Sequence, residues 1–126
     1  MKKRLIPALI WTIGVLYAIF SPGSNVPKIP KFFGSDKLIH FMLFFGLVFL
    51  WNRVINEKPH PIEKKNRYFF TNYLVFWILF AIFTEYMQRY VPGRSFDGWD
   101  IVANALGGTI GTVVFVYLNK RKSALV

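Results

Sequence analysis

The feature that most constrains this chain is the alternation of long apolar segments with short polar connectors. The apolar segments cover residues 5–20, 38–54, 68–87 and 101–118. At 1.5 Å per residue, the third and fourth would be about 30 and 27 Å long, enough to cross the hydrocarbon core of a bilayer. The first two are shorter, and the second is continuously apolar only from Phe41 to Trp51, so it could also be re-entrant. The pattern predicts an all-α, polytopic membrane protein with a four-transmembrane-helix bundle.

Composition supports a membrane protein over a water-soluble one. The chain has 126 residues, the length of a single domain, and 54% of them are hydrophobic. A soluble domain of this size lacks the interior to bury so much apolar surface. There is no cysteine, which excludes disulfides, thiolate metal sites and a cysteine nucleophile. The usual nucleotide-binding and metalloprotease motifs are also absent from the sequence.

The net charge of +10 would suggest a nucleic-acid partner in a soluble domain. Here the basic residues lie beside the apolar segments. We therefore predict that they set the orientation of the chain in the membrane, and that nucleic acid is not a partner. Eleven of the 16 Lys and Arg residues lie at the N-terminus, at the C-terminus, or in the loop between the second and third segments, counting Arg53 at the end of the second segment with that loop. The positive-inside rule therefore predicts a multi-pass protein with both termini in the cytoplasm.

A dense polar block, residues 84–104, lies between the last two apolar segments. It holds three of the six carboxylates of the chain, those of Glu85, Asp97 and Asp100. Charged groups this close to lipid are costly unless they pair, face a cavity or take part in chemistry. The block is therefore a candidate functional site.

Asp36 and His40, at the start of the second segment, are four residues apart and share a helical face. Ser35 or Asp36 could cap this helix while His40 bonds a neighbouring helix, and this structural interpretation is somewhat favoured for the pair alone. Alternatively, Asp36 orients His40 as a general acid, general base or metal ligand. Glu85 similarly has two interpretations, a salt bridge to Arg89 or Arg94, or an acid/base or metal-ligand carboxylate.

The connector and the fourth segment add further polar candidates. Arg94 follows a Pro-Gly turn and either neutralises a nearby carboxylate or holds an anionic group. Asp97 belongs to a second turn, and Asp100 is the expected N-cap of the fourth helix. Asp100, Asn104, Gly107 and Gly111 form one stripe on this helix. We expect the two glycines to allow close helix packing and Asn104 to bond Asp36, His40 or Glu85.

These residues all fall at the same predicted membrane face, where a four-helix bundle would gather them into one polar, outward-facing mouth. If a divalent metal binds there, the expected ligands are His40, Asp36 and Glu85. The expected catalytic set is also His40, Asp36 and Glu85, and the expected binding set is Lys37, Gln88, Arg94, Asp97, Asp100 and Asn104.

The combined motifs resemble the VanZ-like family of small bacterial membrane proteins over nearly the whole chain. They are Asp-Lys-x-x-His-Phe from Asp36, Glu-x-x-Gln from Glu85, Pro-Gly-Arg-x-x-Asp-x-x-Asp from Pro92, and Asn-x-x-Gly from Asn104. The resemblance implies an integral protein of the bacterial cytoplasmic membrane and cell envelope. One member gives low-level resistance to the glycopeptide teicoplanin, and a shared fold does not transfer that activity.

Two functions fit these observations. In the first, the protein is an enzyme acting at the outer leaflet on a phosphate-bearing lipid or lipid-linked cell-wall intermediate. His40 and Glu85 then share the acid/base or ligand roles, while Arg94 holds the anionic group and Asn104 positions the substrate. In the second, it is a non-catalytic protein that binds a lipid head group, an antibiotic such as a glycopeptide, or a partner protein. The sequence leaves the choice, and the oligomeric state, open.

Overall fold

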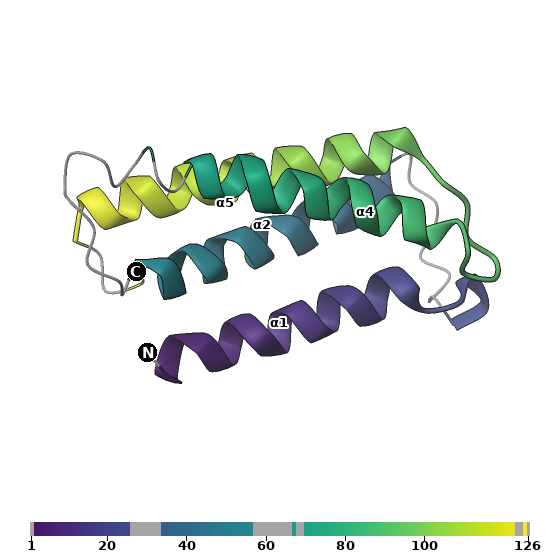
Figure 1. The fold of residues 1–126 in the computed structure, drawn as a ribbon, viewed down its shortest axis with the longest axis horizontal. Helices are drawn as coiled ribbons and strands as arrows, with labels where there is room; N and C mark the ends of the chain where they lie inside the picture. The colour runs from purple at the N-terminus through teal and green to yellow at the C-terminus, as the bar shows by residue number, and fades with distance from the viewer. Residues whose placement is uncertain (1, 26–33, 57–66, 68–69, 123–124, 126) are drawn as a thin grey trace.

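The computed structural model describes residues 2–25, 34–56, 67, 70–122 and 125. Its elements are α1 (Lys2–Phe20), the 3-10 turn η1 (Gly23–Asn25), α2 (Ser35–Ile55), the π-helical turn η2 (Tyr73–Trp77), α4 (Ile78–Gln88) and α5 (Gly98–Lys120). The long helices run side by side along one axis (Figure 1). The described part contains no strand, so the predicted all-α fold is confirmed.

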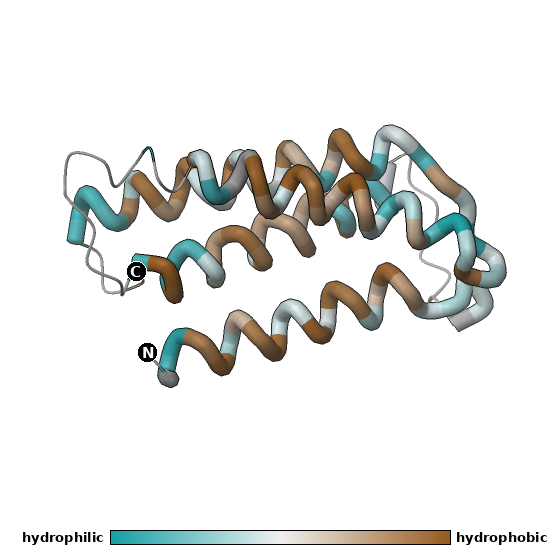
Figure 2. The backbone as a smooth tube through the Cα atoms, viewed as in Figure 1, coloured by the Kyte–Doolittle hydropathy of each residue, from teal (hydrophilic) through white to brown (hydrophobic). Residues whose placement is uncertain are grey.

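Four helical stretches are long and apolar enough to cross a membrane: Lys3–Phe20, Ser35–Ile55, Phe70–Gln88 and Gly98–Lys120. The second is a continuous helix of 21 residues, longer than the apolar run that suggested a re-entrant segment. The third combines η2 with α4, while Tyr68 lies outside the described residues. In Figure 2 the middle parts of the helices are mostly hydrophobic and their ends mostly hydrophilic.

The closest helix pair is α2 with α5, and two glycines explain the close approach. A Cβ added to Gly107 would collide with the backbone carbonyl of Phe41. A Cβ added to Gly111 would lie 2.7 Å from the carbonyl oxygen of Phe45. The predicted packing role of the glycine stripe is therefore confirmed.

A second core joins α1 and α4 to α2. Val15 and Ile19 of α1 pack with Phe44 and Leu47 of α2 and with Ala81 of α4, and all five side chains are buried. Other large apolar side chains point outward, such as Ile10 and Ile13 of α1 and Phe83 of α4. Such extensive exposed apolar surface is typical of helices that face lipid.

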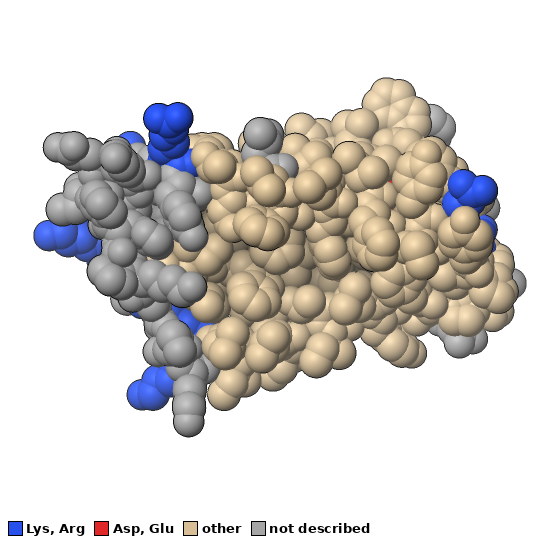
Figure 3. Space-filling model, in the orientation of Figure 1, with Lys and Arg blue, Asp and Glu red and all other residues tan. Residues whose placement is uncertain are grey.

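Charge is concentrated at the ends of the bundle. On the face shown in Figure 3, the Lys and Arg side chains lie only at the two ends, and the visible described residues between them are uncharged. The chain termini lie at one end (Figure 1), and the α4–α5 connector lies at the other. The predicted multi-pass arrangement thus has two distinct polar ends.

Candidate functional site

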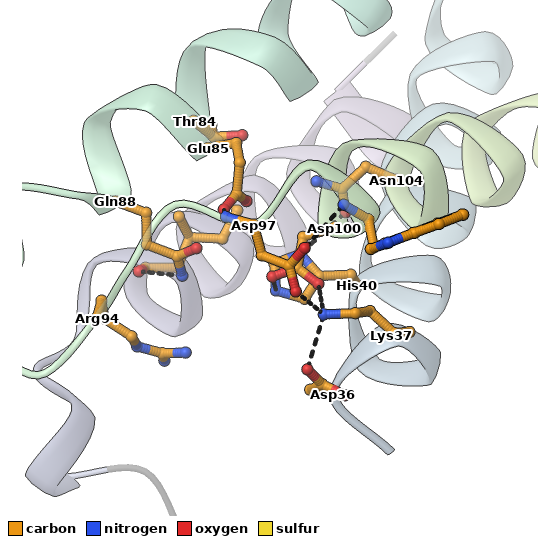
Figure 4. A network of polar contacts seen from close by, with 12 residues as sticks. Asp36, Lys37, His40, Thr84, Glu85, Gln88, Arg94, Asp97, Asp100 and Asn104 are labelled. Atoms are coloured by element: carbon orange, nitrogen blue, oxygen red, sulfur yellow. Dashed lines mark hydrogen bonds and ion pairs between the residues drawn. The ribbon is translucent and has the colours of Figure 1, made fainter. Parts of the chain in front are cut away.

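The polar side chains of α2, α4 and α5 meet at the bundle end opposite the termini (Figures 1 and 4). They come from the first turns of α2 and α5, from the last turns of α4 and from the α4–α5 connector. Several are buried although they are polar, namely His40, Glu85, Gln88, Asp100 and Asn104. The chain thus brings together most residues that the sequence predicted for one mouth.

Lys37 is at the centre of the acidic part of this cluster. Its ammonium lies 2.9 Å from Asp36, 2.5 Å from Asp97 and 2.6 Å from Asp100. Figure 4 shows these carboxylates converging on Lys37 from α2, the connector and α5. The sequence placed Lys37 in the binding set, but it contained no signal that one ammonium would join three carboxylates.

His40 lies between two residues of α5. Its Nδ1 is 3.1 Å from Oδ1 of Asn104, and its Nε2 is 3.5 Å from Oδ2 of Asp100. The prediction that Asn104 would bond a polar residue across the bundle is confirmed, with His40 as the partner. The short distance between α2 and α5, set by Gly107 and Gly111, makes this contact possible.

Asp36 does not orient His40, contrary to one interpretation of their spacing. Its carboxylate is 65% exposed and binds Lys37. Asp100 takes the place expected for Asp36, because it faces His40 from the neighbouring helix. Spacing of four residues fixes a shared helical face, but not which residue of another helix will lie closer.

Glu85 is almost completely buried, with 1% of its surface exposed. Its Oε1 accepts a hydrogen bond of 2.8 Å from the backbone N–H of Asp97. Within the described part of the chain it forms no ion pair, so the first of its two interpretations, a salt bridge to Arg89 or Arg94, is wrong. Instead, Glu85 ties the end of α4 to the start of α5.

Gln88 and Arg94 bind the carboxyl end of α1. Gln88 donates a hydrogen bond to the carbonyl of Ile19. Arg94 donates to the carbonyls of Ala18 and Ser21, at 3.1 and 3.3 Å. Ala18 and Ile19 belong to the last turn of α1, where carbonyls lack a partner within the helix, so the two side chains act as a cap on α1. Arg94 thus pairs with none of the acidic residues expected for it in the described structure.

Both predicted helix caps differ in the structure. Asp97 is the N-cap of α5, where its Oδ1 accepts a hydrogen bond from the N–H of Trp99. Asp100 is already inside the first turn. Gly34, with φ of 90°, precedes α2 and provides no side-chain cap, so neither Ser35 nor Asp36 has that role. Both helices start earlier than their apolar pattern, because polar residues form their first turns.

Asp97 lies outside the spans, and its pKa is lowered from the ordinary value of 3.8. The main cause is the hydrogen bond from the Lys37 ammonium, followed by the bond from the Trp99 backbone. The carboxylate form of Asp97 is therefore stabilised by the fold.

A groove that the sequence did not predict runs beside the cluster. Its volume is about 530 Å³. Asp36 and Lys37 line its polar part, while Trp99, Val102 and Leu106 of α5 line its apolar part. These three α5 side chains are also exposed on the apolar surface of the bundle. The groove therefore connects the lipid-facing surface to the polar cluster.

Comparison with known proteins gives a consistent family match. The family described as VanZ/LLP1 matches residues 4–119, nearly the whole chain. The chain is also 29% identical, over 123 residues, to a protein of Schizosaccharomyces pombe that is described as uncharacterized. The alignment covers 96% of this chain and 67% of that relative. No solved structure matches the chain.

Proposed function

The chain belongs to the VanZ/LLP1 family, and from this premise we propose that it binds and acts on a membrane lipid or lipid-linked cell-wall component. The site faces the outer leaflet of a bacterial cytoplasmic membrane, and both termini are cytoplasmic. The charge distribution of the sequence supports this orientation.

The groove beside α5 is the observation that carries the proposal. An acyl chain fits along Val102 and Leu106, with its head group beside Asp36 and Lys37. Trp99 is 71% exposed at the same end of α5, where an aromatic ring suits the membrane interface. An apolar groove with a polar end is the form expected of a site for an amphiphile.

The polar end also restricts the head group. Lys37 provides one ammonium for the three carboxylates of Asp36, Asp97 and Asp100, and the carboxylate of Glu85 lies near Asp100 without an ion pair in the described residues. This excess of negative charge favours a head group that offers hydroxyl, amide or amine donors. A phosphate-bearing head group requires an additional cation at the site. In the enzymatic form of the proposal, His40 and Glu85 share the acid/base or metal-ligand roles, and Asn104 positions His40.

Lipid that copurifies with the protein tests the groove. We expect native mass spectrometry of the purified wild-type chain to detect bound lipid, and Leu106→Trp to reduce it at least fivefold by filling the groove. Ile110→Trp is the matched control, because Ile110 is exposed one turn further along α5 and does not line the groove. Equal lipid in all three proteins would contradict the proposal.

A second candidate is a non-catalytic protein in which the polar residues brace the helices. The contacts of Gln88 and Arg94 with the carbonyls of α1 favour it. His40→Asn and Glu85→Gln, tested separately with a lipid extract, distinguish the two functions. Turnover of a lipid by the wild type that both variants lose, with unchanged thermal stability, supports an enzyme. Full function in both variants would exclude an enzyme that uses these two groups, and lower thermal stability of the variants would support the bracing role.

The link to glycopeptides is tested in cells. If the chain shares the resistance activity known for one family member, its expression in a susceptible bacterium raises the inhibitory concentration of teicoplanin. Unchanged susceptibility, with the protein present in the membrane, would remove the glycopeptide from the proposal.

A further inference from the structure

Three potential metal ligands converge in the buried part of the cluster. His40, Glu85 and Asp100 come from α2, α4 and α5, and their exposed fractions are 7%, 1% and 7%. One nitrogen or oxygen atom of each lies within 4.8 Å of the others. Bonds of about 2.0–2.2 Å to a common ion require these atoms to move inward by less than about 1 Å.

The balance of charge in this region favours a bound cation. Lys37 offsets part of the charge of Asp36, Asp97 and Asp100. Glu85 has no cationic partner in the described residues, although it is buried. A buried carboxylate without such a partner is costly unless it is protonated or binds a cation.

The orientation of His40 gives a second, independent argument. When Nδ1–H donates to Oδ1 of Asn104, the lone pair of Nε2 faces Oδ2 of Asp100 at 3.5 Å. Two lone pairs in this arrangement suit a shared positive ion, and the distance is too long for a good hydrogen bond. A histidine fixed by a hydrogen bond through its other nitrogen is typical of metal sites.

Asn104 also offers a donor to this region. The residue is 1% exposed, and its Nδ2 has no hydrogen-bond partner in the described structure. Figure 4 shows Asn104 on α5 in the same cluster as His40, Asp100 and Glu85. The amide could therefore donate to an oxygen atom bound to an ion at this site, which gives a purpose to an otherwise costly buried group.

We propose that His40, Glu85 and Asp100 bind a divalent transition-metal ion of the Zn²⁺ or Mn²⁺ type. One imidazole and two carboxylates suit such an ion and leave coordination positions open. Asp36 is not a ligand in this site, in contrast to the set expected from the sequence. A second set of three carboxylates, from Asp36, Asp97 and Asp100, also lies close together, but all three already pair with the Lys37 ammonium.

The metal site goes beyond the proposed function, because an ion can bind without lipid in the groove. If both proposals hold, the ion supplies the positive charge that a phosphate-bearing head group requires at this acidic end. A chain that binds no metal would contradict only the metal site, and a chain that binds no lipid would contradict only the proposed function.

Metal binding by the full chain in detergent tests the inference. After chelation and dialysis against Zn²⁺ or Mn²⁺ alone, mass spectrometry of the metals is expected to show one ion per wild-type chain. His40→Gln and Glu85→Gln should each weaken binding at least about tenfold, and Asn104→Ala should also weaken it. Asp36→Asn is the matched control, since it removes a carboxylate from the same bundle end but not from the ligand set. Its binding should equal that of the wild type.

If the ligand variants fail to fold, a spectroscopic measurement on a chain that retains all three ligands still tests the site. With His60 replaced by Gln, His40 is the remaining histidine of the two in the chain. Electron paramagnetic resonance of Cu²⁺ bound to this protein should then show coupling to a single imidazole nitrogen. Absence of this coupling, lack of metal in the wild type, or equal losses in Asp36→Asn and Glu85→Gln would each overturn the proposal.

Discussion

Asp97 shows how a single side chain can serve two structural purposes. One carboxylate oxygen caps α5 through the N–H of Trp99, and the other pairs with Lys37. Its pKa lies below 3.8 because the charged form is favoured in the fold. Since the pKa is lower in the folded state, the added stability is fully present above 3.8 and is lost as the pH falls through the folded value.

Asp97→Asn separates these two contributions. Asparagine can still cap a helix, but it cannot pair with Lys37. We therefore expect the variant to be less stable than the wild type at neutral pH, and the difference to disappear as the pH falls below 3.8. Asp97→Ala should lose about 1 kcal/mol more at every pH, because the cap is also removed. Thermal unfolding in detergent across a pH series measures both effects. A constant difference between wild type and Asp97→Asn would contradict the assignment.

Arg94 is expected to act on stability through α1. Arg94→Ala removes hydrogen bonds to the carbonyls of Ala18 and Ser21 and should cost on the order of 1 kcal/mol. Arg89→Ala is the control from the same connector, because Arg89 is exposed and its guanidinium lies over Tyr90. Thermal unfolding of the two variants in the same detergent compares them. Equal effects would show that Arg94 does not fasten α1.

The sequence predicted which residues would gather in the site better than it predicted their partners. A charged block beside apolar segments indicates where a polar site lies, because ionisable groups near lipid are costly and occur mainly where they pair or take part in function. The partners depend on the register between helices, which local spacing does not determine. Thus His40 lies against Asp100 and not Asp36, and Arg94 donates to backbone carbonyls and not to a carboxylate. The groove was missed because its walls belong to different segments.

At the scale of elements, the pairing of α2 with α5 places the site residues of both helices in register. The smooth glycine surface of α5 allows the backbones to approach, and His40 then reaches Asn104. The four segments were predictable because their apolar length reflects the thickness of a bilayer. Their first turns were not, since Ser35, Asp36 and Lys37 are polar and do not continue the apolar pattern.

Gly107→Ala should therefore separate α2 from α5. The new methyl group would meet the backbone of Phe41, which cannot rotate away, so we expect a loss of about 1–3 kcal/mol. Gly14→Ala is the control within α1, because a Cβ there has no atom within 4 Å. That change should be neutral or stabilise by up to about 1 kcal/mol. Unfolding in detergent gives both values, and equal stability of the two variants would contradict close packing at Gly107.

At the scale of the whole molecule, the two polar ends differ in kind. The end with the termini carries exposed basic residues such as Lys3, Lys120 and Arg121, whereas the opposite end buries acids within the bundle. Exposed basic residues are typical of the cytoplasmic side. An amphiphile from the outer leaflet would then meet the groove without crossing the bilayer.

The absence of cysteine from the chain makes this orientation directly testable. We expect a cysteine at Ser95, in the exposed α4–α5 connector, to react with a membrane-impermeant maleimide in intact cells. A cysteine at Lys3, exposed at the other end, should react only after lysis. Both should react fully in detergent, which controls for burial. The opposite pattern would place the polar cluster in the cytoplasm, and a lipid substrate would then have to come from the inner leaflet.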